Sequence, residues 1–468
     1  MGKNDVKDLT QGNVFKLILG FSIPLLLGML FQQFYSMVDT IIVGRYLGVT
    51  ALAEVGSTGS INFMIIGFCM GVCNGFAIPV AQKFGARNYK LLRKYVFNSG
   101  VLAVIFSVIM TLVVCLLCRN ILGWMNTPND IMEGAYSYIF VIFLGIPVTY
   151  LYNLLAGIIR SLGDSKTPLM FLIMSSIINI ILDLVFIIVF NMGVSGAAWA
   201  TVISQGVSGI CCLIFMAKRY SILKFEKDEL KINGHCIRRL CYMGVPMGLQ
   251  YSITAIGSVI LQTAVNGLGS LVVAAVTAGS KISMFLCCPF DALGSTMATY
   301  AGQNVGAKKL DRVNEGIKNS IIIGSVYSII AFLVSIFFGK TIALLFVDGN
   351  ELELLSMVSK QLIITALFYI PLCLVNVVRF TIQGMGYSTF AIFAGICEMI
   401  ARTICGFILV PIFGFNAVCL ASPIAWICAD LFLIPGYISV MNKMKREIKP
   451  LTKEKVGNIK EISRSIEV

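Results

Sequence analysis

Acidic residues inside apolar segments are the most informative side chains of this sequence. Asp39, Asp183, Asp291 and Glu398 lie within, or at the edge of, apolar runs long enough to cross a bilayer. Insertion scales put the cost of an ionised residue at that depth at roughly 2.5–3.5 kcal/mol, so such residues are functional candidates by default. These four acids are the first candidates for binding an ion or a cationic molecule.

Asp39 and Asp183 each end a polar stripe. The first stripe is Gln32, Tyr35, Ser36 and Asp39, and the second is Ser175, Ser176, Asn179 and Asp183. Both follow helical spacing, which places the polar groups of each stripe on one helix face. Such a face should be directed toward protein or water, away from lipid.

The two stripes and Thr201 are expected at a similar depth. The helices near 15–38 and 168–190 run in the same direction, and Thr201 stands about two turns into the next helix. The carboxylates, the Asn179 amide and the Thr201 hydroxyl then predict a hard-oxygen cation site for Na⁺, or a carboxylate pair that shares a proton. The alternative is that each acid only hydrogen-bonds a neighbouring helix.

The remaining ionisable candidates lie in the second half of the chain. Glu398 and Arg402 are spaced i, i+4, so they can neutralise each other, and we interpret them as a structural ion pair. Asp291 has no partner in the sequence and could bind a cationic substrate or a proton. We keep all three residues, Asp291, Glu398 and Arg402, as candidates for the substrate pathway. Gln32 and Tyr35 are the corresponding candidates in the first half.

Composition indicates a membrane protein. Of 468 residues, 57% are hydrophobic and 13% charged, against about 25% charged in soluble domains. Twelve apolar runs reach the length of about 20 residues that a span requires. They lie near 15–38, 51–78, 95–117, 135–159, 168–190, 195–217, 240–264, 273–299, 319–338, 361–383, 389–410 and 416–440. The expected fold is all-α and polytopic, with twelve transmembrane helices.

The basic residues follow the membrane topology. The loops between the spans are alternately rich and poor in basic residues. Of 36 Lys and Arg residues, only four fall in the poor loops, namely Arg45, Arg119, Lys340 and Lys360. The positive-inside rule therefore predicts that both termini are cytoplasmic. The net charge of +13 is explained in this way and does not predict a nucleic-acid partner. The first apolar run is too long for a signal peptide, so we expect it to be retained as a span.

The chain contains an internal repeat at an offset of 221–223 residues. Pro24 superposes on Pro246, and the motif AQKFGA on GQNVGA. We expect an N-terminal lobe over 1–220, a solvated cytoplasmic linker over 221–239, a C-terminal lobe over 240–442 and a basic cytoplasmic tail over 443–468. Six spans per half make the two lobes parallel, as in transporters. Pro24 and Pro246 are candidate hinges, although membrane helices also simply tolerate proline.

Several other classes are not expected. The 15 cysteines and the single histidine show no paired spacing, so disulfides and a zinc site are not predicted. No GxxxxGKT loop is present, so ATP is not the direct energy source. We find neither a nucleophile–base pair nor a filter-like segment, which argues against a membrane enzyme and a channel.

The motifs together resemble the multidrug and toxic compound extrusion family. They are FSIPLLLGMLFQQFYSMVDTIIVGRYLG, AQKFGA with GQNVGA, RSLGDSKTP, NIILD and GAAWAT, and the resemblance covers about residues 10–440. It implies a V-shaped antiporter that expels cationic or amphiphilic molecules in exchange for H⁺ or Na⁺. The cation site it implies is Asp39, Asn179, Asp183 and Thr201, with Asn153 and Gln32 nearby and Pro24 at a bend.

The second lobe departs from this family pattern. One branch of the family has a helix glutamate eight residues after the proline, where this chain has Thr254, and the segment near 361–383 contains no acid. A sodium site of that branch is therefore not expected.

We predict a cation-coupled exporter of small organic molecules that works by alternating access in the cell membrane. Its partners are a small-molecule substrate and the bilayer, it needs no cofactor beyond H⁺ or Na⁺, and we expect a monomer. The alternative is a flippase of lipid-linked saccharides with a related two-lobed fold. An anionic pyrophosphate substrate would require several basic residues facing the cavity, and few are available.

Overall fold

The computed structural model describes residues 7–344, 346, 347 and 349–466, with side chains described through residue 447. The first half forms helices and no strand within this part of the chain. The helices are α1 (Val14–Ser57), α2 (Gly59–Gly85), α3 (Tyr89–Trp124), α4 (Met132–Leu144), α5 (Ile146–Ser161), α6 (Lys166–Leu184) and α7 (Val194–Arg219). A π-helical turn, Val185–Val189, extends α6.

The second half repeats this arrangement. Its helices are α8 (Gly234–Asn266), α9 (Ser270–Gly306), α10 (Leu310–Ala343), α11 (Leu352–Leu367), α12 (Tyr369–Gly384), α13 (Thr389–Ile404), α14 (Val410–Phe413) and α15 (Phe415–Ile466). The π-helical turn Cys405–Leu409 joins α13 to α14. The helix α15 continues far into the basic tail, beyond the span expected to end near residue 440.

The helices of the described residues account for twelve membrane spans when each bent pair is counted as one span. Ten are long and apolar enough alone, and two further spans are bent pairs, α4 with α5 at 46° and α11 with α12 at 52°. Pro147 and Pro371 stand in the first turn after each break and withhold a backbone N–H there. The expected all-α fold with twelve spans is confirmed.

The two candidate hinge prolines do not interrupt their helices. Pro24 lies inside α1 and Pro246 inside α8. The non-helical position within α1 is instead Gly48, with a φ of 87° that glycine adopts without strain. The hinge role of the prolines stays a prediction.

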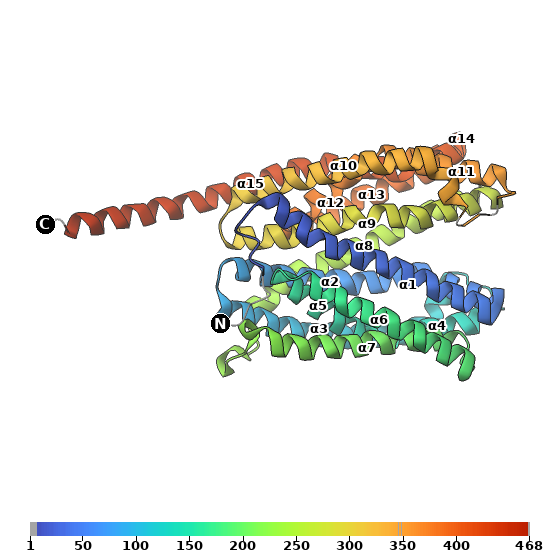
Figure 1. The fold of residues 1–468 in the computed structure, drawn as a ribbon, viewed down its shortest axis with the longest axis horizontal. Coiled ribbons are helices and arrows are strands. Elements are labelled where there is room, and N and C mark those ends of the chain that lie inside the picture. The colour runs from blue at the N-terminus through green and yellow to red at the C-terminus, as the bar shows by residue number, and fades with distance from the viewer. Residues whose placement is uncertain (1–6, 345, 348, 467–468) are drawn as a thin grey trace.

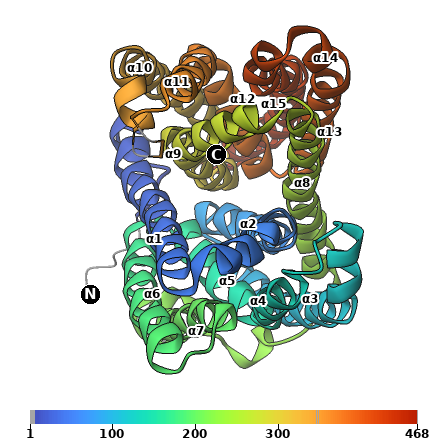
Figure 2. The ribbon, with the colours of Figure 1, turned by 90° about the vertical axis from the view of Figure 1, so that its right-hand side faces the viewer.

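Two helical bodies face each other, with both chain ends at the same end of the molecule (Figure 1). Figure 2 shows α1 and α8 between these bodies on opposite sides. The helix α1 packs against both α6 and α9, and α8 packs against both α2 and α13. Each half is thus held to the other by its own first helix.

Glycines allow α2 and α8 to approach closely. Gly71 and Gly75 of α2 face Gly244 and Gly248 of α8, and each pair is spaced as GxxxG. A Cβ added at Gly75 would lie 2.5 Å from the Gly244 Cα, so no larger residue fits without displacing the backbone. Such small-residue faces are the usual means of tight helix packing in membranes.

The repeated motifs meet where α2 and α9 cross, at the end that carries the termini. A Cβ on Gly85 would overlap the Gln303 carbonyl, and a Cβ on Gly306 would overlap the Gln82 carbonyl. The Gln82 amide donates to the Gly384 carbonyl at 2.9 Å. The two halves are therefore closed against each other at this end.

The segment before α1 adds to this closure. Leu9 is buried, and its N–H donates to Gln303 Oε1 at 2.9 Å. The Gln303 amide donates in turn to the Ser161 carbonyl at 2.9 Å. Lys309 Nζ donates to the Thr10 carbonyl at 2.8 Å. The N-terminal segment thus bridges both halves.

Most of the linker, including residues 224–228 and 230–232, is exposed, but one of its acidic residues is not. Glu229 is fully buried, and its carboxylate accepts hydrogen bonds from Arg93 Nε and Nη2 at 2.6 and 2.7 Å. These bonds, above all others, lower the pKa of Glu229 to about 2. Asn98 Oδ1 also accepts from the Asn233 N–H at 2.9 Å, directly before α8 begins at Gly234. Glu229, which was expected to be solvated, thus attaches the linker to α3.

Candidate functional site

Two carboxyl groups meet inside the first lobe. Asp183 of α6 is fully buried, whereas Asp39 of α1 is half-buried and lines a cavity. The two carboxyl groups lie close enough to interact directly with each other. One oxygen of each, Asp39 Oδ1 and Asp183 Oδ1, has no hydrogen-bond partner among the described residues. Asp39 thus stands between the cavity and the buried Asp183.

Asn179 and Thr201 complete this cluster. The Asn179 amide donates to Thr201 Oγ1 at 3.3 Å. With the amide rotated, its nitrogen donates to Asp183 Oδ2 at 3.2 Å and its oxygen accepts from the Thr201 N–H at 3.3 Å, which satisfies both groups. The structure therefore brings the four predicted cation-site residues together, from α1, α6 and α7.

Two tyrosines surround the acids. Tyr35, one turn before Asp39, lines the cavity with Gln32, as the polar stripe predicts. Tyr138 of α4 also lies close enough to Asp39 and Asp183 to interact electrostatically with both. Tyr138 was missed by the sequence analysis because nothing in an otherwise apolar stretch distinguishes a tyrosine that faces a site from one that faces lipid.

The chemistry open to this cluster follows from its charges. No Lys or Arg forms an ion pair with Asp39 or Asp183 in the described part of the chain. Two carboxylates in contact cannot both stay ionised without a compensating cation. The cluster can therefore hold a shared proton, or a hard cation with oxygen ligands from the carboxylates, Asn179 and Thr201.

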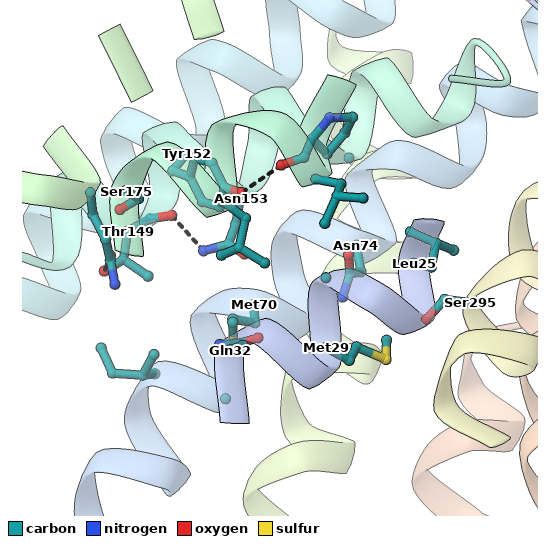
Figure 3. Close-up of a pocket in the computed structure, with 18 of the residues that line it drawn as sticks. Leu25, Met29, Gln32, Met70, Asn74, Thr149, Tyr152, Asn153, Ser175 and Ser295 are labelled. Carbon is teal, nitrogen blue, oxygen red and sulfur yellow. Dashed lines mark hydrogen bonds between the residues drawn. The ribbon is translucent and has the colours of Figure 1, made fainter. Parts of the chain in front are cut away.

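The cavity beside this cluster has a volume of about 570 Å³ and is lined by both halves. Figure 3 draws Gln32, Asn74 and Asn153 of the first half and Ser295 of the second around it. The Asn153 amide donates to the Thr149 carbonyl at 2.9 Å, so its oxygen is left for a ligand. Several methionines, which adapt to differently shaped molecules, also belong to the lining. They are Met29, Met70, Met247 and Met284.

The lining includes two charged side chains, Asp39 and Arg160. Arg160 of α5 donates from Nη2 to Asn74 Oδ1 at 3.1 Å. The span expected near 135–159 would end just before Arg160 and leave this arginine in the loop that follows. The helix in fact continues through it and turns it toward the cavity.

In the second lobe, the predicted ion pair of Glu398 and Arg402 is present, with 3.9 Å between Arg402 Nη2 and Glu398 Oε2. Arg379 of α12, which was not predicted, forms a closer buried ion pair with Glu398. Arg402 also donates from Nη1 to the Thr254 carbonyl at 3.4 Å. Spacing within one helix could not show a partner that comes from a neighbouring helix.

Asp291 and Asp430 lie near the same arginine. Asp291 of α9 is exposed, and Asn376 and the charge of Arg379, both from α12, lie close enough to interact with it. Asp430 of α15 is buried, with Oδ1 unpartnered among the described residues and Arg379 and Glu398 nearby. Asp430 is not among the residues predicted from the sequence, although a single acid in the apolar run 416–440 was a visible signal.

Comparison with known proteins agrees with this architecture. The sequence profile of the MatE family matches residues 24–185 and 246–408, one stretch in each half. The probable multidrug resistance protein YoeA of Bacillus subtilis (strain 168) is 28% identical over 455 residues, which cover 93% of this chain and 96% of that protein. An FAD transporter of Shewanella oneidensis is 21% identical over 406 residues, which cover 85% and 88%.

Solved structures show the same fold. The outward-facing conformation of a multidrug resistance MATE family transporter matches with a TM-score of 0.89 at 21% identity, covering 95% of this chain and 100% of that one. A MATE structure in the bent conformation matches with a TM-score of 0.84 at 22% identity, covering 94% and 98%. With both halves matched by the family profile, the chain belongs to the multidrug and toxic compound extrusion family, MatE, of membrane transporters.

Proposed function

We propose that this protein exports small cationic or amphiphilic organic molecules in exchange for H⁺ or Na⁺, with Asp39 and Asp183 as the coupling carboxylates. The observation that carries the proposal is the contact between these two acids at the wall of the central cavity. Asn179 and Thr201 would supply the further oxygen ligands of a sodium ion, or the hydrogen bonds that orient a protonated pair.

The position of the pair supports coupling between ion and cargo. Asp39 is accessible from the cavity, while Asp183 is buried behind it, so an ion reaches Asp183 by way of Asp39. Neutralising the pair removes the repulsion between two buried carboxylates and changes how α1 packs against α6. An ion gradient can bias a two-state rocking motion in this way.

The orientation belongs to the same proposal. The closed end carries the chain termini and the basic loops, which the positive-inside rule places in the cytoplasm. With both termini there, this structure is closed toward the cytoplasm and its cavity is directed outward. The protein would act as a monomer in the cell membrane, with the bilayer and its cargo as partners.

The lining of the cavity disfavours the flippase alternative. A pyrophosphate-linked lipid carries several negative charges, yet Arg160 is the one basic side chain lining the described cavity. Of the two sequence relatives described above, one is named for multidrug resistance and the other as an FAD transporter. The names of the relatives differ in cargo, so the class of molecule rests on the cavity.

Efflux from proteoliposomes tests the proposal. Wild type, Asp183→Asn and the matched control Asp130→Asn, an exposed acid, are loaded with ethidium and subjected in turn to a pH and a Na⁺ gradient. We expect wild type and the control to move ethidium under one gradient, which identifies the ion, and Asp183→Asn to lose this dependence. Gradient-driven transport by Asp183→Asn at the wild-type rate would contradict the coupling role.

A further inference from the structure

A positively charged side chain lines the closed end of the cavity, and the export of a cation does not require it. Arg160 is partly exposed to the cavity, and no described carboxylate lies within ion-pair distance of it. An arginine inside a membrane span is costly unless its charge is used. We infer that Arg160, Asn74 and Tyr251 form a subsite for a carboxylate group of the transported molecule.

The donors of this subsite converge on one place. Arg160 Nη2 donates to Asn74 Oδ1 at 3.1 Å. Tyr251 lines the same cavity and lies close enough to interact with both Asn74 and Arg160. The Tyr251 O–H and the remaining guanidinium N–H groups are then available as donors. A guanidinium fork matches the two oxygens of a carboxylate.

Both halves of the protein contribute to this arrangement. Arg160 and Asn74 belong to α5 and α2, whereas Tyr251 belongs to α8. The adjoining Ser161 carbonyl accepts from Gln303, which places Arg160 next to the closed end of the cavity. The subsite is complete when the lobes are closed at that end.

One carboxylate of the protein approaches this site. Asp291 lies close enough to Tyr251 to interact with it electrostatically. Asp291 interacts with Asn376 and is compensated by Arg379, on the side of Tyr251 that belongs to the second lobe. It therefore leaves the Arg160 charge available to a ligand.

The subsite is far from the acid pair. Arg160 follows Thr149 by eleven residues of α5, which is about 16 Å along a helix. The Thr149 hydroxyl donates to Gln205 Oε1 at 3.3 Å. Gln205 lies on α7, one helical turn after Thr201, which belongs to the acid cluster. The cavity thus has a negative group toward one end and a positive group at the other. It is complementary to an elongated zwitterionic molecule.

This inference rests on the proposed export function and specifies its substrate class. Its test uses equilibrium binding without any ion gradient, so the two can fail separately. Two dyes share one cationic xanthene: rhodamine 110 carries a free carboxylate, and rhodamine 123 is its methyl ester. Fluorescence anisotropy measures the binding of each to the purified full-length chain in detergent.

We expect Arg160→Gln to weaken rhodamine 110 binding roughly tenfold or more, the usual effect of losing one charge-assisted bond. Binding of rhodamine 123 should stay within about twofold of wild type. Arg160→Lys should retain part of the carboxylate preference, because it keeps the charge without the fork. Tyr251→Phe should cost about threefold for rhodamine 110 alone. Arg45→Gln, an exposed site on α1, is the charge-matched control.

Three results would overturn the subsite. They are a wild type that does not bind rhodamine 110, an Arg160→Gln variant that binds it as wild type does, and an equal loss for both dyes. The last result would assign Arg160 a purely structural role, and retention of wild-type elution on size exclusion shows that the variant is folded. Ethidium efflux under a gradient is independent of all three.

Discussion

Replacing Arg379 with methionine is expected to destabilise the second lobe strongly. Arg379 and Glu398 form an ion pair in which the two residues are 6% and 3% exposed. Removing the guanidinium leaves Glu398 as a buried charge, with only Arg402 at 3.9 Å to compensate it. Asp291 and Asp430 also lose the nearest positive charge.

The size of this effect follows from the burial. Breaking a buried pair by removing one partner costs about 3–5 kcal/mol, mainly because the other charge stays unpaired. Arg402→Met should cost less, about 1–2 kcal/mol, since its distance to Glu398 is long for a hydrogen bond. The double variant Arg379→Met/Glu398→Gln should recover about 2 kcal/mol relative to Arg379→Met, because no charge remains at Glu398.

The free energy of unfolding can be measured by titrating SDS into dodecyl maltoside micelles and following near-ultraviolet circular dichroism. Methionine keeps the apolar stem of arginine, so the change reports on the guanidinium. The reasoning is refuted if Arg379→Met unfolds within about 1 kcal/mol of wild type, or if the double variant is no more stable than Arg379→Met alone.

Gly75→Leu is expected to prevent assembly of the two halves. Gly100→Leu should leave assembly unchanged, because an added Cβ there meets nothing within 4 Å. Size-exclusion profiles of the two variants check this. Gln303→Ala removes the acceptor of the Leu9 N–H, so hydrogen exchange at that amide should accelerate roughly tenfold; unchanged exchange would show that the N-terminal segment is held by other contacts. Because the pKa of Glu229 is held at about 2, below its ordinary 4.5, linker docking should be complete above about pH 4.5 and lost as pH falls toward 2. Hydrogen exchange of the linker at several pH values measures this, and an exchange rate without pH dependence beyond the intrinsic one would refute it.

Much of the fold could be predicted because membrane insertion imposes simple requirements. Twelve apolar runs of sufficient length correspond to twelve spans, including the two that bend. The repeat of AQKFGA as GQNVGA showed a duplication. That these motifs contact each other could not be predicted, because an internal repeat does not specify which faces of its two halves pack together.

The candidate site was predictable from the polar residues that share a helix face and, for Thr201, from its expected depth and the family resemblance. The stripes ending at Asp39 and Asp183 have this property, and the structure brings their acids together. Arg379 and Glu398 belong to different helices, so their pairing depends on tertiary packing that no spacing rule contains. Arg160 was misplaced because loop boundaries are uncertain by about a turn. The roles of all these residues stay predictions until they are measured.

The crossing of α2 and α9 has the geometry of a twofold homodimer contact. Gly85 meets the Gln303 carbonyl, and its counterpart Gly306 meets the Gln82 carbonyl, so each half presents both the glycine and the oxygen. Isologous interfaces have this reciprocity, in which one surface recognises a copy of itself. A six-helix chain with this motif needs nothing from a different partner to form the contact. Fusing two copies would preserve it, and each copy could then diverge elsewhere, as the different charges of the two lobes show.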